Sequence, residues 1–125
     1  MNQDDLKKRT KAFALRVMKL VDALPRTTAG RAIGNQLVRS GTSVGANYRA
    51  ACRGRSKAEF VAKLGVVIEE ADETGFWMEL IIDGALMEHD KVESLLNEAS
   101  ELVAIFTASQ KTAKSAISNP KSAIQ

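Results

Sequence analysis

The sequence predicts an all-α protein, an up-down-up-down antiparallel four-helix bundle. Apolar residues recur at steps of three and four through four long segments, which places them on one face of each helix. The connections between these segments are short, and short connections make consecutive helices antiparallel neighbours. The chain also contains only two prolines in 125 residues, so long helices can run without interruption.

The length and composition are those of a single globular domain. A chain of 125 residues is long enough to bury a core without disulfides or metal ions. Its one cysteine, Cys52, excludes an internal disulfide and fits the reducing cytoplasm. The start of the chain lacks the basic-then-apolar order of a signal peptide. No apolar run approaches the ~20 residues that span a bilayer. We therefore expect a cytoplasmic protein with no membrane partner.

The first helix is expected over residues 4–24, because apolar residues follow helical spacing from Leu6 to Leu24. Pro25 should end it, since the residue before a proline is disfavoured in helical geometry. The second helix is expected over residues 28–53.

Two threonines, Thr27 and Thr28, stand where the second helix should begin, and either can cap its free amide groups. Glycines then recur near one face of this helix, among them Gly41 and Gly45. Glycine costs about 1 kcal/mol relative to alanine inside a helix, so close approach of another backbone should offset that cost. We expect this face to form a tight seam within one bundle; the alternative is an interface between subunits.

The third helix is expected over residues 57–87. Ser56 and Glu59 have the spacing of a capping box, in which each side chain accepts a hydrogen bond from the other residue's amide. Trp77 lies beside the main apolar stripe of this helix, so the helix is predicted to be apolar on two sides.

The fourth helix is expected over residues 91–116, with Asp90 as its cap and His89 in the preceding turn. The polar segment 117–125 is expected to be a disordered tail. Residues 1–116 then form the single domain.

Charge is segregated along the chain. Residues 25–65 carry eight basic residues against one acidic residue, and residues 66–101 carry eleven acidic residues against one lysine. Such a chain has a dipolar surface unless its acidic and basic segments pair with each other. Carboxylates crowd the third helix, and we expect nearby arginines to pair with them, the candidates being Arg39, Arg49 and Arg53.

Basic residues also gather in the first helix and at the turn between the second and third helices. Such clusters can hold phosphates through charge-assisted contacts that read no base sequence. Two interpretations stay open: binding of a nucleic-acid backbone, or pairing with carboxylates within or between subunits. The predicted nucleic-acid contacts are Lys7, Lys8, Arg9, Lys11, Arg49, Arg53, Arg55 and Lys57.

The sequence argues against an enzyme, and we predict no catalytic residue, metal ligand or cofactor. The one histidine, His89, has no histidine or cysteine partner with metal-ligand spacing. The glycines near Gly41 lack the lysine of a phosphate-binding loop. A magnesium-dependent hydrolase using the carboxylates of the third helix, Glu73 among them, is a distant alternative.

Four stretches of the chain resemble a known family. They read QLVRSGTSVGANYRAA, then SKAEFVAKL with EEADETGFWMEL, then EASELVAIFTASQKTAK. They are similar to the small "four helix bundle protein" family, whose members include proteins encoded in intervening sequences of bacterial large-subunit ribosomal RNA genes. The matching structural or interface positions are Arg39, Ser40, Gly41, Ser43, Gly45, Asn47, Glu59, Phe60, Glu73 and Trp77.

The resemblance implies a bundle that assembles into a homo-oligomeric ring, typically a homopentamer. A related group, the accessory proteins of diversity-generating retroelements, binds nucleic acid and a reverse transcriptase through a basic surface. We therefore expect a non-enzymatic protein that binds nucleic acid, RNA rather than DNA. The alternative is a structural or adaptor homo-oligomer with no nucleic-acid ligand.

Overall fold

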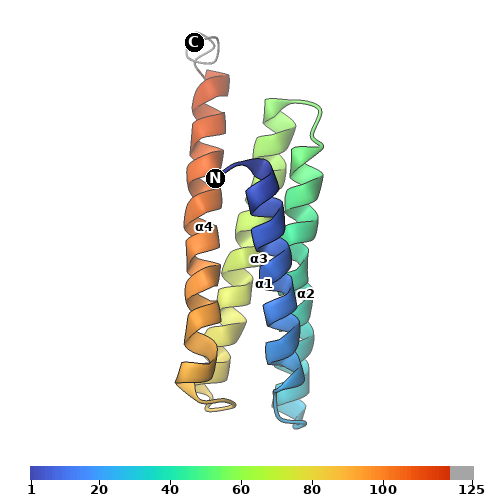
Figure 1. Cartoon of the computed structure of the whole chain (residues 1–125), viewed down its shortest axis with the longest axis vertical. Helices are drawn as coiled ribbons and strands as arrows, with labels where there is room; N and C mark the ends of the chain where they lie inside the picture. The colour runs from blue at the N-terminus through green and yellow to red at the C-terminus, as the bar shows by residue number, and fades with distance from the viewer. Residues whose placement is uncertain (119–125) are drawn as a thin grey trace.

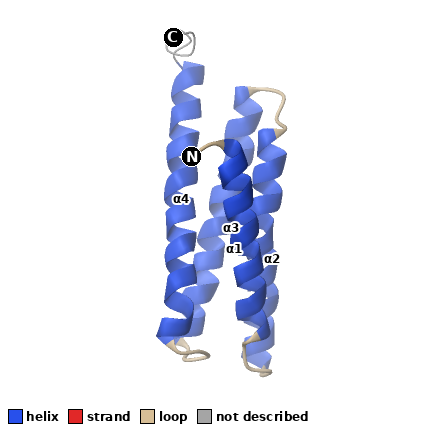
Figure 2. Ribbon diagram, in the orientation of Figure 1, coloured by secondary structure: helices blue, strands red, loops and turns tan. Residues whose placement is uncertain are grey.

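The computed structural model describes residues 1–118 and contains four long helices over them (Figure 1). Consecutive helices run in opposite directions, and the segments between them are short loops, as Figure 2 shows. No strand occurs within the described range. The predicted all-α four-helix fold is therefore confirmed. The helices are α1 (Gln3–Asp22), α2 (Thr28–Cys52), α3 (Lys57–Asp83) and α4 (His89–Ser118).

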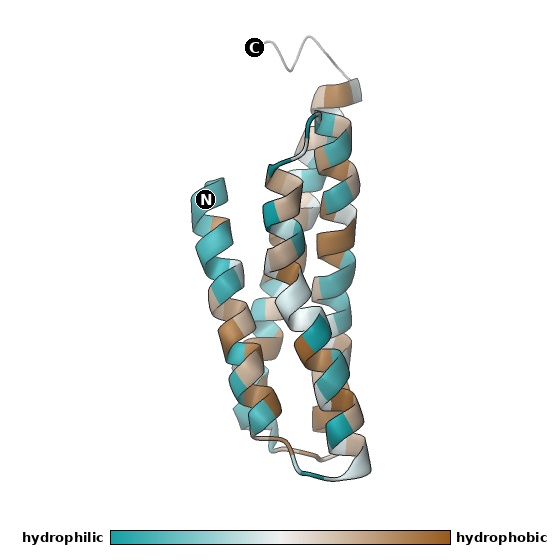
Figure 3. Cartoon of the chain, turned by 90° about the vertical axis from the view of Figure 1, so that its right-hand side faces the viewer, coloured by the Kyte–Doolittle hydropathy of each residue, from teal (hydrophilic) through white to brown (hydrophobic). Residues whose placement is uncertain are grey.

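The helices pack in a square in which α1 and α3 occupy opposite corners. Helix α2 packs closely against both α1 and α3, and α3 packs closely against α4. The seam between α1 and α4 is much sparser. In Figure 3 the first turns of α1 are hydrophilic and its second half carries more hydrophobic residues. Helix α1 therefore depends mainly on α2 for its position.

The core lies along the axis of the bundle and takes large side chains from every helix. Each such side chain stabilises the fold by about 1.5–3 kcal/mol relative to an exposed position. The rings of Tyr48 and Phe106 meet with their centroids 4.9 Å apart, which joins α2 to α4. The largest fully buried side chains are Phe13, Val17, Leu37, Val44, Tyr48, Leu64, Val67, Met78, Ile81, Val92, Leu102 and Phe106.

The helices begin where local capping residues allow. Thr27 caps α2 by accepting a hydrogen bond from the amide of Gly30 at 3.0 Å, so the first of the two candidate threonines is the cap. Ser56 caps α3 by accepting from the amide of Glu59 at 3.1 Å. The Glu59 carboxylate accepts from the amide of Arg55 at 3.2 Å, so the predicted capping box forms with its return bond shifted by one residue.

Several helix boundaries differ from the prediction. Helix α1 ends at Asp22 rather than residue 24. Helix α3 ends at Asp83 rather than residue 87, because Gly84 caps it and Ala85 takes a positive φ of 56°. The apolar residues that follow, Leu86 and Met87, continue the helical spacing but pack against the end of the core as a loop.

Helix α4 is longer than predicted at both ends. It begins at His89, so that residue and Asp90 lie in its first turn rather than before it. It continues to Ser118, which makes residues 117 and 118 helical instead of part of a tail. Its last turns contain alanine and lysine, which are strong helix formers. The rest of the predicted tail, residues 119–125, lies outside the described residues.

The glycine face of α2 forms the seam with α1. A Cβ atom added at Gly41 would lie 2.7 Å from Cγ1 of Val17, and one added at Gly45 would lie 3.2 Å from Oγ1 of Thr10. Real Cβ atoms do not approach as closely as the first of these distances. The close approach of α1 and α2 therefore requires glycine at position 41, and the predicted seam within one bundle is confirmed.

Candidate nucleic-acid interface

Four of the predicted cations surround one cavity on the surface between α1 and α2. Lys7, Lys8 and Lys11 come from α1, and Arg49 comes from α2. The cavity has a volume of about 440 Å³, and we term it the basic hollow. Its other lining residues are Thr10, Ala14, Thr42, Gly45 and Ala46.

Helical spacing on both helices assembles the basic hollow. Lys7, Lys11 and Ala14 follow one another at steps of four and three, which places them on one face of α1. The same steps relate Thr42, Ala46 and Arg49 on α2. Thr10 and Gly45 are buried at the base of the hollow, whereas Lys8, Lys11 and Arg49 are exposed around it, so a charged rim surrounds a floor of small residues. The sequence analysis did not predict this floor, although its signal is present in the sequence as small residues at steps of three and four on both helices.

The rim cations are not neutralised within the described part of the chain. No carboxylate of residues 1–118 lies within 4.0 Å of the charged nitrogens of Lys7, Lys8, Lys11 or Arg49. Lys8, Lys11 and Arg49 are also exposed to solvent. The hollow therefore presents four positive charges to an anionic ligand.

The remaining predicted contacts lie at the same end of the bundle, where α2 ends and α3 begins (Figure 1). Arg53 follows Arg49 by four residues, so it continues the rim by one helical turn. Arg55 is exposed in the connecting loop. Lys57 instead lines a separate cavity of about 720 Å³ between the starts of α1 and α3 and the end of α4. Arg53 is thus the natural extension of the hollow, with Arg55 and Lys57 more peripheral.

Arg9 lies on a different side of α1. It is two residues from both Lys7 and Lys11, which is about 200° around the helix axis. Its guanidinium donates two hydrogen bonds to the carboxylate of Glu98 on α4, from Nε to Oε2 at 2.8 Å and from Nη2 to Oε1 at 2.7 Å. Nη2 also donates to Oε2 of Glu101 at 3.0 Å. Arg9 therefore joins α1 to α4, and we leave it out of the interface.

One of the three candidate arginines pairs with the carboxylates of α3. Arg39 contacts Glu70 at 3.2 Å and also pairs with Glu73. The Glu73 carboxylate accepts a further hydrogen bond from Nε1 of Trp77 at 3.0 Å. The corresponding prediction is confirmed for Arg39. Arg49 has no such partner within the described residues, nor does Arg53.

The other signature residues pack the bundle. Ser40 is fully buried, and its hydroxyl lies 3.0 Å from that of Thr74 across the α2–α3 seam. Ser43 donates to the carbonyl of Arg39, and Asn47 donates to the carbonyl of Ser43, so both side chains form their hydrogen bonds within α2. Phe60 is half-buried against the core.

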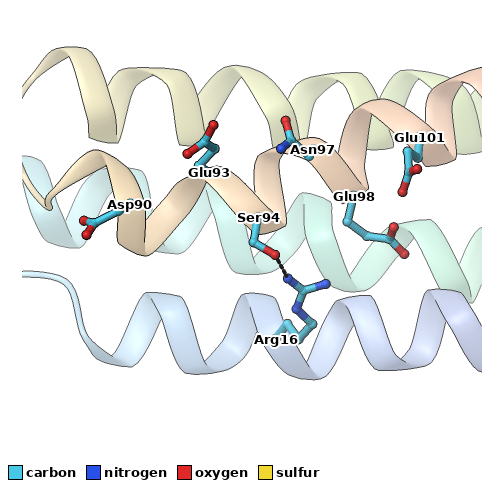
Figure 4. Close-up of a pocket in the computed structure, with 7 residues that line it drawn as sticks. All are labelled: Arg16, Asp90, Glu93, Ser94, Asn97, Glu98 and Glu101. Carbon is cyan, nitrogen blue, oxygen red and sulfur yellow. Dashed lines mark hydrogen bonds between the residues drawn. The ribbon is translucent and has the colours of Figure 1, made fainter.

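A third, acidic cavity of about 470 Å³ lies on the α1–α4 seam (Figure 4). Nη2 of Arg16 donates to Oγ of Ser94 across it at 2.9 Å. Among residues 1–118, no three histidine, cysteine or carboxylate side chains come together as metal ligands. The cavity lies where the contact between α1 and α4 is sparse. Its remaining lining residues are Asp90, Glu93, Asn97, Glu98 and Glu101.

The Arg9–Glu98 pair should make this seam sensitive to acid. The hydrogen bond from Arg9 holds the pKa of Glu98 below its ordinary value of 4.5. A depressed pKa means that the pair stabilises the fold above the unfolded pKa, and that this contribution disappears as the pH falls through the lower, folded pKa. We expect Glu98→Gln to lower the free energy of unfolding by about 1–2 kcal/mol at neutral pH, and by much less near pH 3.

Urea denaturation at both pH values measures this difference. Glu101→Gln is the matched control, because its side chain is 66% exposed and such a pair is worth under about 1 kcal/mol. An equal cost of Glu98→Gln at both pH values would contradict the prediction.

No helix within residues 1–118 is long and apolar enough to cross a membrane.

Comparison with known proteins agrees with the fold. The family described as 23S rRNA-intervening sequence protein matches residues 3–108. A crystal structure of a protein of unknown function from the S23 ribosomal protein family of Bacteroides thetaiotaomicron is 32% identical in sequence. It superposes with a TM-score of 0.82, and the alignment covers 89% of this chain and 99% of that one. None of the curated proteins matches the chain. Since the family match spans most of the sequence, the chain belongs to the 23S rRNA-intervening sequence protein family.

Proposed function

We propose that this protein binds the phosphate backbone of RNA through the basic hollow, and that it does so without catalysing a reaction. The observation that carries the proposal is the convergence of four unpaired cations from two helices on one cavity. Lysines act as mobile point charges toward phosphate, and an arginine offers a planar pair of donors. Arg53 extends this surface toward the loop.

The family name supports RNA over DNA as the ligand, since it refers to 23S ribosomal RNA. Phosphate contacts position a protein on its ligand but carry no sequence information. We therefore expect binding that depends on charge and depends little on base sequence. The family resemblance suggests a nucleic-acid enzyme such as a reverse transcriptase as a partner. In this proposal the enzyme and the protein bind the same RNA molecule.

We also infer that the protein associates with copies of itself. Helix α3 carries three exposed apolar side chains, Val66, Phe76 and Leu80, which are 36–49% exposed. Acidic residues lie among them, including Glu69 and Asp72. Phe76 and Leu80 are four residues apart and so lie on one face of α3, and a contiguous apolar patch on a surface is a mark of contact with another protein.

Helix α1 offers a surface complementary to this stripe. Leu15 and Met18 are about half exposed, and Lys19 lies one turn beyond Leu15. Because α1 and α3 occupy opposite corners of the bundle, a contact between them joins different faces of two copies. Such a contact is heterologous and gives a ring if its rotation closes, as in the pentamer implied by the resemblance.

In the alternative function, the basic residues form contacts between subunits only, and the protein has no nucleic-acid ligand. In that case Lys11 and its neighbours would face the carboxylates of the next subunit, and the protein would act as a scaffold or adaptor. The exposed stripe of α3 is the observation that favours it.

Binding of a labelled, mixed-sequence RNA across a salt series separates the two functions. About four phosphate contacts predict a log–log slope near −3, so affinity should fall roughly 50-fold between about 50 and 200 mM salt. Light scattering on the same samples reports the assembly. No RNA binding at low salt, together with a ring that loosens as salt rises, would overturn the RNA proposal in favour of the scaffold.

A further inference from the structure

We propose that the basic hollow takes the base of one unpaired nucleotide, so that the protein prefers single-stranded RNA to duplex RNA. This inference rests on the proposed RNA-binding function and names the form of RNA that the site selects. Its basis is the contrast between the charged rim of the hollow and its uncharged floor.

The floor is built from small side chains and is closed by the contact of two helices. Gly45 and Thr10 bring the helices together at its base. The methyl groups of Ala14 and Ala46 form part of its walls. A volume of about 440 Å³ lies within the range of pockets that hold small organic ligands, about 300–1,000 Å³.

The two hydroxyl groups of the floor are already used within their own helices. Oγ1 of Thr10 donates to the carbonyl of Leu6 at 2.8 Å, and Oγ1 of Thr42 donates to the carbonyl of Val38 at 2.6 Å. A hydroxyl group has one hydrogen to donate, so neither offers a donor to the edge of a base. The floor therefore offers apolar contact to the flat face of a base and no hydroxyl donor to its edge.

The rim supplies the remaining parts of a nucleotide site. Three lysines of α1 stand along one wall, where they can reach the phosphates on either side of a nucleotide. Arg49 stands on the opposite helix, and the plane of a guanidinium group can stack on an unpaired base. Duplex RNA keeps its bases paired and stacked inside the helix, so it could engage only the rim.

The test compares single-stranded and duplex RNA of about 12 nucleotides at one salt concentration. Phosphate contacts alone would favour the duplex, because its charge density is higher. We expect the wild-type protein to bind the single strand about tenfold more tightly, the effect of one stacked base.

Ala46→Leu fills the hollow without changing charge, at a position that is exposed on α2. It should lower single-strand affinity about tenfold and leave duplex affinity unchanged. Ala32→Leu is the matched control, an exposed alanine of the same helix outside the hollow, and should bind as the wild type does. Circular dichroism checks that both variants fold.

Two results separate this inference from the function on which it rests. Binding of both RNAs with no preference for the single strand, or a preference that survives Ala46→Leu, would overturn the inference alone. Failure of the wild-type protein to bind either RNA at low salt would overturn the proposed function with it.

Discussion

Replacing Lys11 and Arg49 together by glutamate should weaken RNA binding more than about a hundredfold at low salt. These residues line the basic hollow from α1 and from α2 respectively. The double substitution removes two phosphate contacts and places two negative charges beside the ligand. Each lost contact also lowers the salt dependence, so the log–log slope should become shallower by about 1.5. Fluorescence anisotropy with labelled RNA measures both quantities.

The control for this variant must change net charge equally and leave the hollow intact. Arg26 and Lys91 are exposed and lie outside the hollow, in the α1–α2 loop and the first turn of α4. Replacing both by glutamate makes the same change in net charge. We expect a reduction of only a few-fold, from weaker long-range attraction. Equal losses in the two double variants would show that net charge, and not the hollow, governs binding.

Gly41→Leu should destabilise the fold by about 3 kcal/mol, because the α1–α2 seam has no room for a side chain. An added Cβ would lie 2.7 and 2.8 Å from the two methyl carbons of Val17. Val17 is fully buried, and a β-branched side chain has little freedom to rotate away in a helix. Such a loss is a large part of the 5–15 kcal/mol that holds a typical domain together. Thermal denaturation followed by circular dichroism should show a midpoint lowered by roughly 10–15 °C.

A pair of alanine substitutions tests the packing explanation against helix propensity. An added Cβ at Gly75 would make only ordinary contact, 3.7 Å from Cδ1 of Leu96. Gly75→Ala should therefore stabilise the fold by about 0.5–1 kcal/mol, whereas Gly41→Ala should destabilise it by about 1–2 kcal/mol. If the Gly41→Leu variant had the same melting temperature as the wild-type protein, the close packing of α1 against α2 at Gly41 would be contradicted.

The fold was largely predictable because its signals are local. The caps Thr27 and Ser56 act on amides within three residues of themselves, and apolar spacing repeats along each helix. The largest boundary error, at the end of α3, fell where a residue's role depends on distant parts of the chain. Leu86 and Met87 continue the apolar spacing of α3, but they cover the end of the core after the helix has stopped at Asp83.

The candidate site was only partly predictable for the same reason. Proximity in sequence grouped Arg9 with Lys7 and Lys11, although helical rotation turns it toward α4 and its carboxylates. Arg39 and Arg49 are alike in the sequence, yet Arg39 meets two glutamates of α3 and Arg49 meets none within the described residues. Partners across a seam depend on which helix faces come together.

The sequence by itself determined the helical class, the number of helices, most of their starts and the excess of positive charge before residue 66. These follow from spacing, capping and composition, which act within a few residues. Only the tertiary structure decided which cations are paired and which surround the basic hollow. That choice depends on the close contact of α1 with α2 at Gly41 and Gly45, because this contact brings Lys7 and Arg49 to one cavity from positions far apart in the chain.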